Sequence, residues 1–235
     1  MKQRIPLPQE PIAEMDAVIQ YDKGAKYYIM PEYKYFVWKI LRKGITAGRV
    51  LDIGTGSGLL AIELAKISKR DSFDITAIDI SENMLKKARQ NARKYHVEDK
   101  IKFLHGTASA LPFPDKSFEL VISYASLHHW FDPVAVFNEI ARVTTETGCI
   151  IIRDNKRVYQ NPFWKCGIWL ISRFMNKRHR ENWPKAILAS YTIPEIKELV
   201  SKSQLKNCRV SSDFVFIDLC IESQCPAEKP RSDNN

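Results

Sequence analysis

Short apolar runs alternate with amphipathic stretches through the middle of the chain. The runs are rich in β-branched residues and are five to seven residues long, which is typical of buried parallel strands. They are RVLDI (49–53), DITAIDI (74–80), IKFLH (101–105), ELVIS (119–123) and GCIIIR (148–153). Helical spacing of apolar residues lies between them, over 59–67, 82–95 and 133–143. The alternation predicts strands that are each followed by a helix.

This order of elements indicates an α/β fold. Right-handed crossovers between parallel strands place helices on both faces of one open sheet. Two further runs, NCRV (207–210) and DFVFIDL (213–219), are separated only by Ser211 and Ser212, which predicts an antiparallel hairpin at one edge. We therefore expect a Rossmann-like, doubly wound, mostly parallel sheet of seven strands.

The flanking segments complete one domain over 1–222. Helical patterns over 10–21 and 31–42 predict an N-terminal helical cap (1–45), followed by a core (46–155). We expect an inserted helical lid over 156–205, the hairpin over 206–222 and a disordered tail over 223–235. Ser81, Asp132 and Thr192 stand where helix N-caps are expected, and Glu195 fits the first turn of a late helix.

Composition excludes several classes of protein. The 235 residues are 45% hydrophobic and 27% charged, which is ordinary for a folded globular chain. No apolar stretch reaches the roughly 18 residues that span a bilayer, and the start of the chain has no apolar signal-peptide region. The five cysteines form no CxxC pair, so we expect neither a disulfide framework nor a zinc cluster, and a reducing cytoplasmic setting.

The excess of positive over negative charge is confined to one segment. Twelve lysines and arginines and only three glutamates lie between 156 and 209, which accounts for the whole net charge of +9. The segment begins with an apolar stretch over 163–175, followed by KRHR (177–180). An apolar helix of this length is buried, covers an apolar ligand or lies on a membrane surface over 162–180. The basic cluster itself fits contact with phosphate, with an acidic substrate or with anionic lipid, and it equally fits a solvated surface.

The stretch VLDIGTGSG (50–58) has glycines at every second position. A P-loop needs Gly-Lys-Ser/Thr, whereas Gly58 is followed by two leucines, so that interpretation fails. The dinucleotide fingerprint GxGxxG is weakened, because its third glycine would fall at Leu59. The pattern D-x-G-x-G-x-G matches at all four fixed positions, from Asp52 to Gly58. Glycines of this kind let backbone approach a ligand closely.

This loop resembles motif I of the class I S-adenosylmethionine-dependent methyltransferases. The resemblance implies that Asp52 faces the ammonium group of the cofactor and that Gly54, Thr55 and Gly56 lie against it. The bound molecule would be S-adenosylmethionine, with S-adenosylhomocysteine as the product.

Later stretches resemble the same family in the same order. In AIDISENMLKKAR (77–89), the resemblance places Asp79 at the ribose hydroxyls and Ile80 and Met84 at the adenine. In HGTASALPFPDKSFELVIS (105–123), Thr107 stands where the family usually has an adenine-reading aspartate, next to Ala108. The hydroxyl of Thr107 is able to accept the same hydrogen bond.

The run SYASLHHWFDP (123–133) is similar to the loop after the fourth strand in the ubiquinone and menaquinone C-methyltransferase branch. It contributes Tyr124 as a cofactor-binding candidate and His128 or His129 as the catalytic base. A polar histidine pair in a loop is the alternative, and two adjacent histidines make no metal site, so we expect no metal.

The segment QYDKGAKYYIMPEY (20–33) is similar to the tyrosine-rich segment that closes over the cofactor in these enzymes. Tyr28 is its cofactor-binding candidate, and Tyr21 and Tyr27 are either part of that closure or ordinary core and surface aromatics. Arg153 and Asp154 follow the fifth strand, where they either reach the pocket or form a salt bridge.

The resemblance implies methyl transfer to a small, apolar or aromatic acceptor under the lid, with oligomeric state undetermined. An RNA methyltransferase that uses the basic 156–209 segment is an alternative, although no RNA-binding module is recognisable. A non-catalytic S-adenosylmethionine-binding regulator is the third interpretation.

Overall fold

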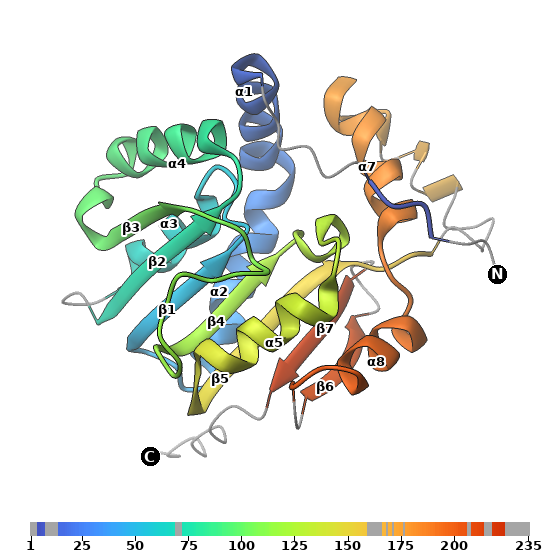
Figure 1. Ribbon diagram of the computed structural model, residues 1–235. Coiled ribbons are helices and arrows are strands. Elements are labelled where there is room, and N and C mark those ends of the chain that lie inside the picture. The colour runs from blue at the N-terminus through green and yellow to red at the C-terminus, as the bar shows by residue number, and fades with distance from the viewer. Residues whose placement is uncertain are drawn as a thin grey trace, which may run out of the picture.

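A single seven-stranded sheet forms the centre of the computed structural model (Figure 1). The structure describes residues 4–7, 14–68, 72–158, 166–167, 169–170, 172–175, 177–205, 208–213 and 218–223. The strands lie in the order β3-β2-β1-β4-β5-β7-β6. They are β1 (Gly48–Ile53), β2 (Phe73–Asp79), β3 (Ile101–His105), β4 (Phe118–Tyr124), β5 (Thr144–Asn155), β6 (Cys208–Asp213) and β7 (Asp218–Ser223).

The first five strands are parallel, and β7 is antiparallel to both of its neighbours. The strand order reverses at β1, which has β2 on one side and β4 on the other. In open sheets of this kind, ligands bind beyond the carboxyl ends of the strands at that reversal point. The predicted fold class is therefore confirmed, with an antiparallel edge made by β7 and β6.

Helices cover both faces of the sheet (Figure 1). One face carries α2 (Met30–Arg42), α3 (Leu59–Ile67) and α4 (Glu82–Lys94), and the other carries α5 (Pro133–Val143) and α8 (Ile193–Ser201). The remaining helices are α1 (Met15–Gly24), a π-helical turn (Ala25–Ile29), α7 (Lys177–Ala189) and two 3-10 turns (Glu98–Lys100 and Leu127–His129). Each face buries its own apolar cluster, which holds the helices in place.

Side-chain caps begin three helices where the sequence predicts them. The Ser81 hydroxyl accepts from Met84 N at 3.3 Å, and Asp132 Oδ1 accepts from Ala135 N at 3.0 Å. At α8 the N–H of Thr192 donates to Glu195 Oε2 at 2.8 Å, as half of a capping box. These caps fix where the helices start relative to the preceding strand ends.

The predicted turn of the terminal hairpin is wrong. Ser211 and Ser212 lie inside β6, paired with positions 220 and 219 of β7. Polar residues are tolerated there because β6 is an edge strand. The second strand is accordingly β7, which ends at Ser223, and Ser223 therefore belongs to the sheet and not to a tail. The expected tail over 224–235 lies outside the described residues.

The N-terminal cap is present, but its first helix begins at Met15 and runs through the π-helical turn into α2. Much of the predicted apolar helix over 163–175 lies outside the described residues. Among those described, no helix is both long and apolar enough to cross a membrane. Cys149 is disulfide-bonded, although the sequence was expected to hold no disulfide framework.

Candidate cofactor and acceptor site

The loop after β1 is shaped by glycines in left-handed conformations. Gly54 has φ +71° and Gly56 has φ +55°, which side-chain-bearing residues rarely adopt. A Cβ on Gly54 would lie 2.1 Å from Ser126 Oγ, so the loop can approach the segment after β4 only with glycine there. A Cβ on Gly56 would meet only the Tyr21 ring, at 3.8 Å. The backbone at Gly56 thus forms an open floor.

This floor belongs to a cleft of about 360 Å³, which we call the loop cleft. The volume is in the range of roughly 300–1,000 Å³ typical of small-ligand sites. Seven predicted cofactor residues line it: Gly54, Gly56, Asp79, Ile80, Met84, Thr107 and Ala108. Tyr21, Ser126, His129 and Trp130 also line it. The strand ends therefore bring residues from four separate sequence stretches to one place.

Asp79 is held rigidly at the carboxyl end of β2. Its Oδ2 accepts from Gly56 N and its Oδ1 accepts from Ser81 N, both at 2.8 Å. Burial raises the pKa of Asp79, and the two N–H donors oppose that shift by stabilising the carboxylate. The side chain is thus an oriented acceptor between the glycine loop and α4, which suits recognition of a diol.

Asp52 and Thr55 lie beneath the loop and do not line the loop cleft. Asp52 is 1% exposed and accepts from the Thr55 hydroxyl at 2.7 Å. Burial raises its pKa to about 7, against the lowering effect of that hydrogen bond. Contact between Asp52 and an ammonium group of the cofactor stays a prediction.

The two histidines of the 3-10 turn after β4 have different surroundings. His128 is buried, with Nδ1 2.7 Å from Asp154 Oδ1 and its backbone N–H donating to Asp154 Oδ2 at 3.0 Å. His129 lines the loop cleft, and its ring centroid lies 4.2 Å from that of His128. His129 is exposed to the cleft. Desolvation by the surrounding cleft walls, and then the neighbouring His128, lower its pKa to about 4. His129 is therefore neutral at pH 7.

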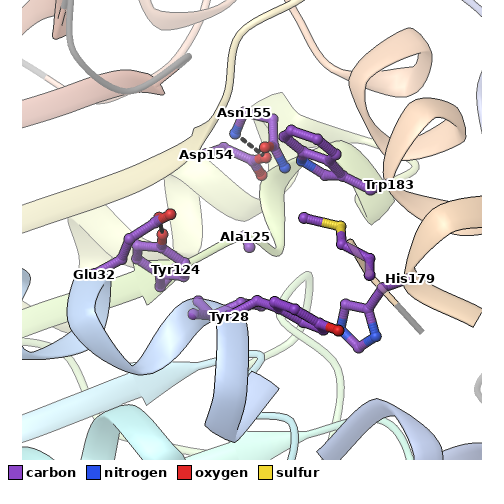
Figure 2. Close-up of a pocket in the computed structure, with 10 residues that line it drawn as sticks. Tyr28, Glu32, Tyr124, Ala125, Asp154, Asn155, His179 and Trp183 are labelled. Atoms are coloured by element: carbon purple, nitrogen blue, oxygen red, sulfur yellow. Dashed lines mark hydrogen bonds between the residues drawn. The ribbon is translucent and has the colours of Figure 1, made fainter. Parts of the chain in front are cut away.

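A second cavity of about 110 Å³ lies beside the loop cleft and shares Ala125 with it. Its lining residues come from the N-terminal helices, the ends of β4 and β5, α7 and the residues just before α7, and Figure 2 shows them around a common space. They are Tyr28, Ile29, Glu32, Tyr124, Ala125, Asp154, Asn155, Met175, His179 and Trp183. We call this the second cavity. The N-terminal cap, the sheet and α7 meet around it.

Two predicted cofactor residues, Tyr28 and Tyr124, line the second cavity and not the loop cleft. The Tyr28 hydroxyl donates to the carbonyl of Phe174 at 3.0 Å, and the Tyr124 hydroxyl hydrogen-bonds to Glu32. Tyr21 lines the loop cleft, whereas Tyr27 is 78% exposed. The tyrosine-rich segment therefore divides between the two spaces.

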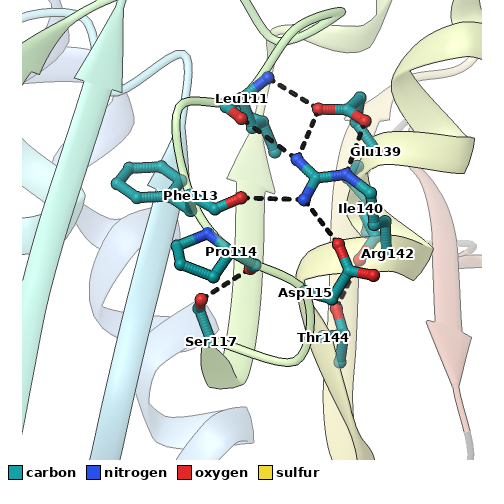
Figure 3. Close-up of polar contacts among 9 residues, drawn as sticks. All are labelled: Leu111, Phe113, Pro114, Asp115, Ser117, Glu139, Ile140, Arg142 and Thr144. Atoms are coloured by element: carbon teal, nitrogen blue, oxygen red, sulfur yellow. Dashed lines mark hydrogen bonds and ion pairs between the residues drawn. The ribbon is translucent and has the colours of Figure 1, made fainter.

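A guanidinium clamp holds the segment that follows Thr107 and Ala108 (Figure 3). Arg142 of α5 donates through Nη2 to the Leu111 carbonyl at 3.0 Å. Through Nη1 it donates to the Phe113 carbonyl at 2.8 Å and to Asp115 Oδ1 at 2.9 Å. Glu139 accepts from Arg142 Nε at 2.8 Å, and this pairing raises the pKa of Arg142. The clamp thus fixes the segment next to one wall of the loop cleft, although that segment has no regular secondary structure.

Comparison with known proteins agrees with this geometry. Residues 51–152 match the methyltransferase domain family. Residues 51–152 therefore form a domain of the class I S-adenosylmethionine-dependent methyltransferase type. The match spans β1 to β5, the part of the chain that carries the glycine loop, Asp79 and the histidine pair.

Curated relatives that the chain resembles act on small molecules by name. The chain is 38% identical over 106 residues to 27-O-demethylrifamycin SV methyltransferase of Amycolatopsis mediterranei, covering 45% of this chain and 38% of that protein. It is 30% identical over 150 residues to the ubiquinone/menaquinone biosynthesis C-methyltransferase of Shewanella woodyi, covering 60% of this chain and 59% of that one. The chain thus spans less than two thirds of the length of either relative.

Solved structures show the same fold over nearly the whole chain. A candidate S-adenosyl-L-methionine-dependent methyltransferase from Methanococcus maripaludis superposes with a TM-score of 0.69 at 24% identity, covering 94% of this chain and 98% of that one. A SAM-dependent methyltransferase from Aquifex aeolicus gives a TM-score of 0.64 at 16% identity, covering 89% and 97%.

Sequence reasoning missed several residues of both spaces. Glu32, Asn155, His179 and Trp183 line the second cavity, but none of them was a site candidate. Glu32 lies in the tyrosine-rich stretch 20–33 and His179 in the basic cluster 177–180, where other properties drew the interpretation. Asn155 directly follows Asp154 at the end of β5, so its position relative to the other strand ends was an available signal. Glu32 looks like an ordinary charged position of an amphipathic helix. Of the two residues expected either to reach the pocket or to form a salt bridge, Asp154 lines the second cavity. Arg153 is buried, with its guanidinium carbon 5.2 Å from the centroid of the Tyr35 ring.

Proposed function

We propose that this protein transfers the methyl group of S-adenosylmethionine to a small acceptor bound in the second cavity. The observation that carries this proposal is the junction at Ala125, where the second cavity adjoins the loop cleft. S-adenosylmethionine supplies an electrophilic methyl group on a sulfonium sulfur. Transfer by in-line displacement needs the acceptor and the methyl group to be aligned across such a junction.

The residues of the loop cleft fit the cofactor. Asp79 is placed to accept from the ribose hydroxyls, because its carboxylate is held between the glycine loop and the start of α4. Ile80 and Met84 offer apolar contact to the adenine, and the open backbone at Gly56 leaves room for the amino-acid portion. A larger residue at position 56 would fill this space.

The acceptor is proposed to be apolar or aromatic over part of its surface. The rings of Tyr28, Tyr124 and Trp183 line the second cavity, and aromatic walls exclude water and contact flat or apolar molecules well (Figure 2). The residues of the second cavity would therefore act mainly by orienting the acceptor and by keeping water from the reacting atoms.

His129 is the proposed proton acceptor for acceptors that must lose a proton. It lines the loop cleft and is neutral at pH 7, so its ring can take a proton. A pKa of about 4 makes it a weak base, which suits an acceptor whose proton becomes acidic only during transfer. His128 is proposed as a positioning residue, because its ring is tied to Asp154 behind His129.

Calorimetric titration with S-adenosylhomocysteine, alongside NAD, tests the cofactor assignment. We expect saturable binding of S-adenosylhomocysteine and none of NAD. Asp79→Ala should weaken that binding by more than about 100-fold, because it removes the acceptor for two hydroxyls, each bond to a charged group being worth roughly 1.5–3 kcal/mol. Asp74→Ala, on the same strand but exposed, is the matched control and should bind normally. Binding of NAD alone would refute the proposal.

A further inference from the structure

Two carboxyl groups line the second cavity, on different elements. Glu32 comes from α2 and Asp154 from the end of β5, and they lie on two sides of the space in Figure 2. We propose that the second cavity binds a protonated amine, so that the acceptor carries an ammonium head group. This inference deepens the proposed function and rests on it.

Glu32 is the carboxyl group best placed to receive a cation. It is half-buried and takes a hydrogen bond from the Tyr124 hydroxyl. Burial raises its pKa, and the Tyr124 hydrogen bond and the positive charge of Arg153 only oppose that shift. An ammonium group in the cavity would supply a further positive charge and an N–H donor to this carboxylate.

Asp154 adds acceptor character to the cavity wall. It receives three N–H contacts, from the ring and backbone of His128 and from the Asn155 backbone at 2.6 Å. Two of these are to Oδ1, which leaves Oδ2 with only one partner at 3.0 Å among the described residues. A carboxylate oxygen accepts two hydrogen bonds readily, so Oδ2 of this cavity-lining residue has capacity for a further donor.

The rest of the lining agrees with a cation. The rings of Tyr28, Tyr124 and Trp183 present π systems, which attract an ammonium group placed over their faces. None of the ten described lining residues is lysine or arginine, although the chain as a whole carries a net charge of +9. The cavity therefore combines negative charge and aromatic surface in a basic protein.

The volume indicates a head group and not a whole ligand. About 110 Å³ is well below the roughly 300–1,000 Å³ of sites that enclose drug-sized molecules. An acceptor with an ammonium end in the second cavity would extend past Ala125 toward the loop cleft, where the methyl group is expected.

Phenethylamine and 2-phenylethanol are a matched pair of probes, alike in shape and different in charge. Each is titrated calorimetrically into the full-length protein saturated with S-adenosylhomocysteine. We expect the amine to bind at least about 10-fold more tightly, the low end for a hydrogen bond to a charged group. Glu32→Gln, which preserves size and the Tyr124 contact, should reduce that preference below about 3-fold while the affinity for the alcohol is unchanged.

Glu146→Gln is the control for loss of one negative charge, because Glu146 lies at the opposite end of β5 and is exposed. It should leave the preference intact. Equal affinity for the two probes, binding of neither, or an undiminished preference in Glu32→Gln overturns the inference. The initial titration separates the two proposals: a protein that fails to bind S-adenosylhomocysteine refutes the proposed function, whereas one that binds it without preferring the amine refutes only the head group.

Discussion

Asp52 is the residue where burial and charge oppose each other most directly. It is 1% exposed, and the described hydrogen bond to its side chain comes from Thr55. Burial, together with the negative charge of Asp79, raises its pKa from 3.8 to about 7. In the folded protein the carboxyl group therefore holds its proton over a pH range in which the unfolded chain has lost it.

This shift predicts a specific pH dependence of stability. A carboxyl group whose folded pKa is raised contributes stability below its unfolded pKa of 3.8, and that stability is lost as pH rises toward 7. Without ligand, the free energy of unfolding should fall by about 2 kcal/mol between pH 5 and pH 8 because of this group. Asp52→Asn preserves the shape and an acceptor for Thr55, and it should lack that fall.

Urea unfolding of both proteins at the two pH values measures the difference. The wild-type protein should lose stability relative to Asp52→Asn as pH rises. Parallel pH dependence in the two proteins would show that Asp52 ionises normally and that the loop admits water beneath it.

At the scale of elements, Gly24 sets how closely α7 approaches α1. A Cβ at position 24 would lie 1.9 Å from Cε1 of His179. The His179 ring lies 5.9 Å from the Tyr21 ring of the loop cleft and 5.6 Å from the Tyr28 ring of the second cavity. One residue of α7 therefore contacts the walls of both spaces, and its position depends on a glycine at the end of α1.

The contact predicts that the effect of Gly24→Ala on stability changes sign when His179 is also replaced by alanine. Gly24→Ala should destabilise the protein by about 1–3 kcal/mol, because the methyl group overlaps a packed ring. In a His179→Ala background the same change should be neutral or stabilising by up to about 1 kcal/mol, since alanine favours the helix. Thermal unfolding of the four proteins measures the coupling.

Gly167→Ala is the control, because no atom of the described residues lies within 4 Å of a Cβ built at position 167. It should leave stability nearly unchanged. Equal costs of Gly24→Ala in both backgrounds would mean that α7 does not rest on Gly24.

The regular elements were predictable because a short sequence stretch contains the apolar pattern of each one. α3 and α5 match their predicted ranges, and β3 does as well, since each is a continuous apolar or periodic run with a cap or turn beside it. The family resemblance singled out Asp79, at the end of β2, and Met84, and both line the loop cleft. The β6–β7 pairing was misplaced because polar edge residues such as Ser211 carry no alternation signal.

The second cavity could not be predicted in the same way. Its residues come from α2, the ends of β4 and β5, and α7, which only tertiary packing brings together. Glu32 and Trp183 have no local pattern that separates them from surface residues. The expected role of Tyr28 at the cofactor likewise depended on a helix direction that sequence periodicity does not give.

At the scale of the whole molecule, the basic segment over 156–209 itself carries exposed apolar side chains. Trp169 is 60% exposed, Leu170 is 54% exposed and Phe174 is 79% exposed. The Arg173 guanidinium carbon lies 5.5 Å from the centroid of the Trp169 ring. RNA bases would stack on the two aromatic rings, but an exposed leucine adds nothing to RNA binding. A lipid interface, in contrast, buries all three of these apolar side chains next to a cation.

We therefore expect this surface to bind anionic membranes. The protein should cosediment with phosphatidylcholine vesicles that contain phosphatidylserine, and much less with phosphatidylcholine alone, because surface charge attracts the basic segment. Raising the salt concentration should weaken binding through screening, while the apolar contact limits the loss. Trp169→Ala combined with Phe174→Ala should reduce vesicle binding at every salt concentration. Trp38→Ala removes an exposed aromatic of α2 and should not. Binding to single-stranded RNA that exceeds vesicle binding, and that the double variant weakens, would instead assign the surface to nucleic acid.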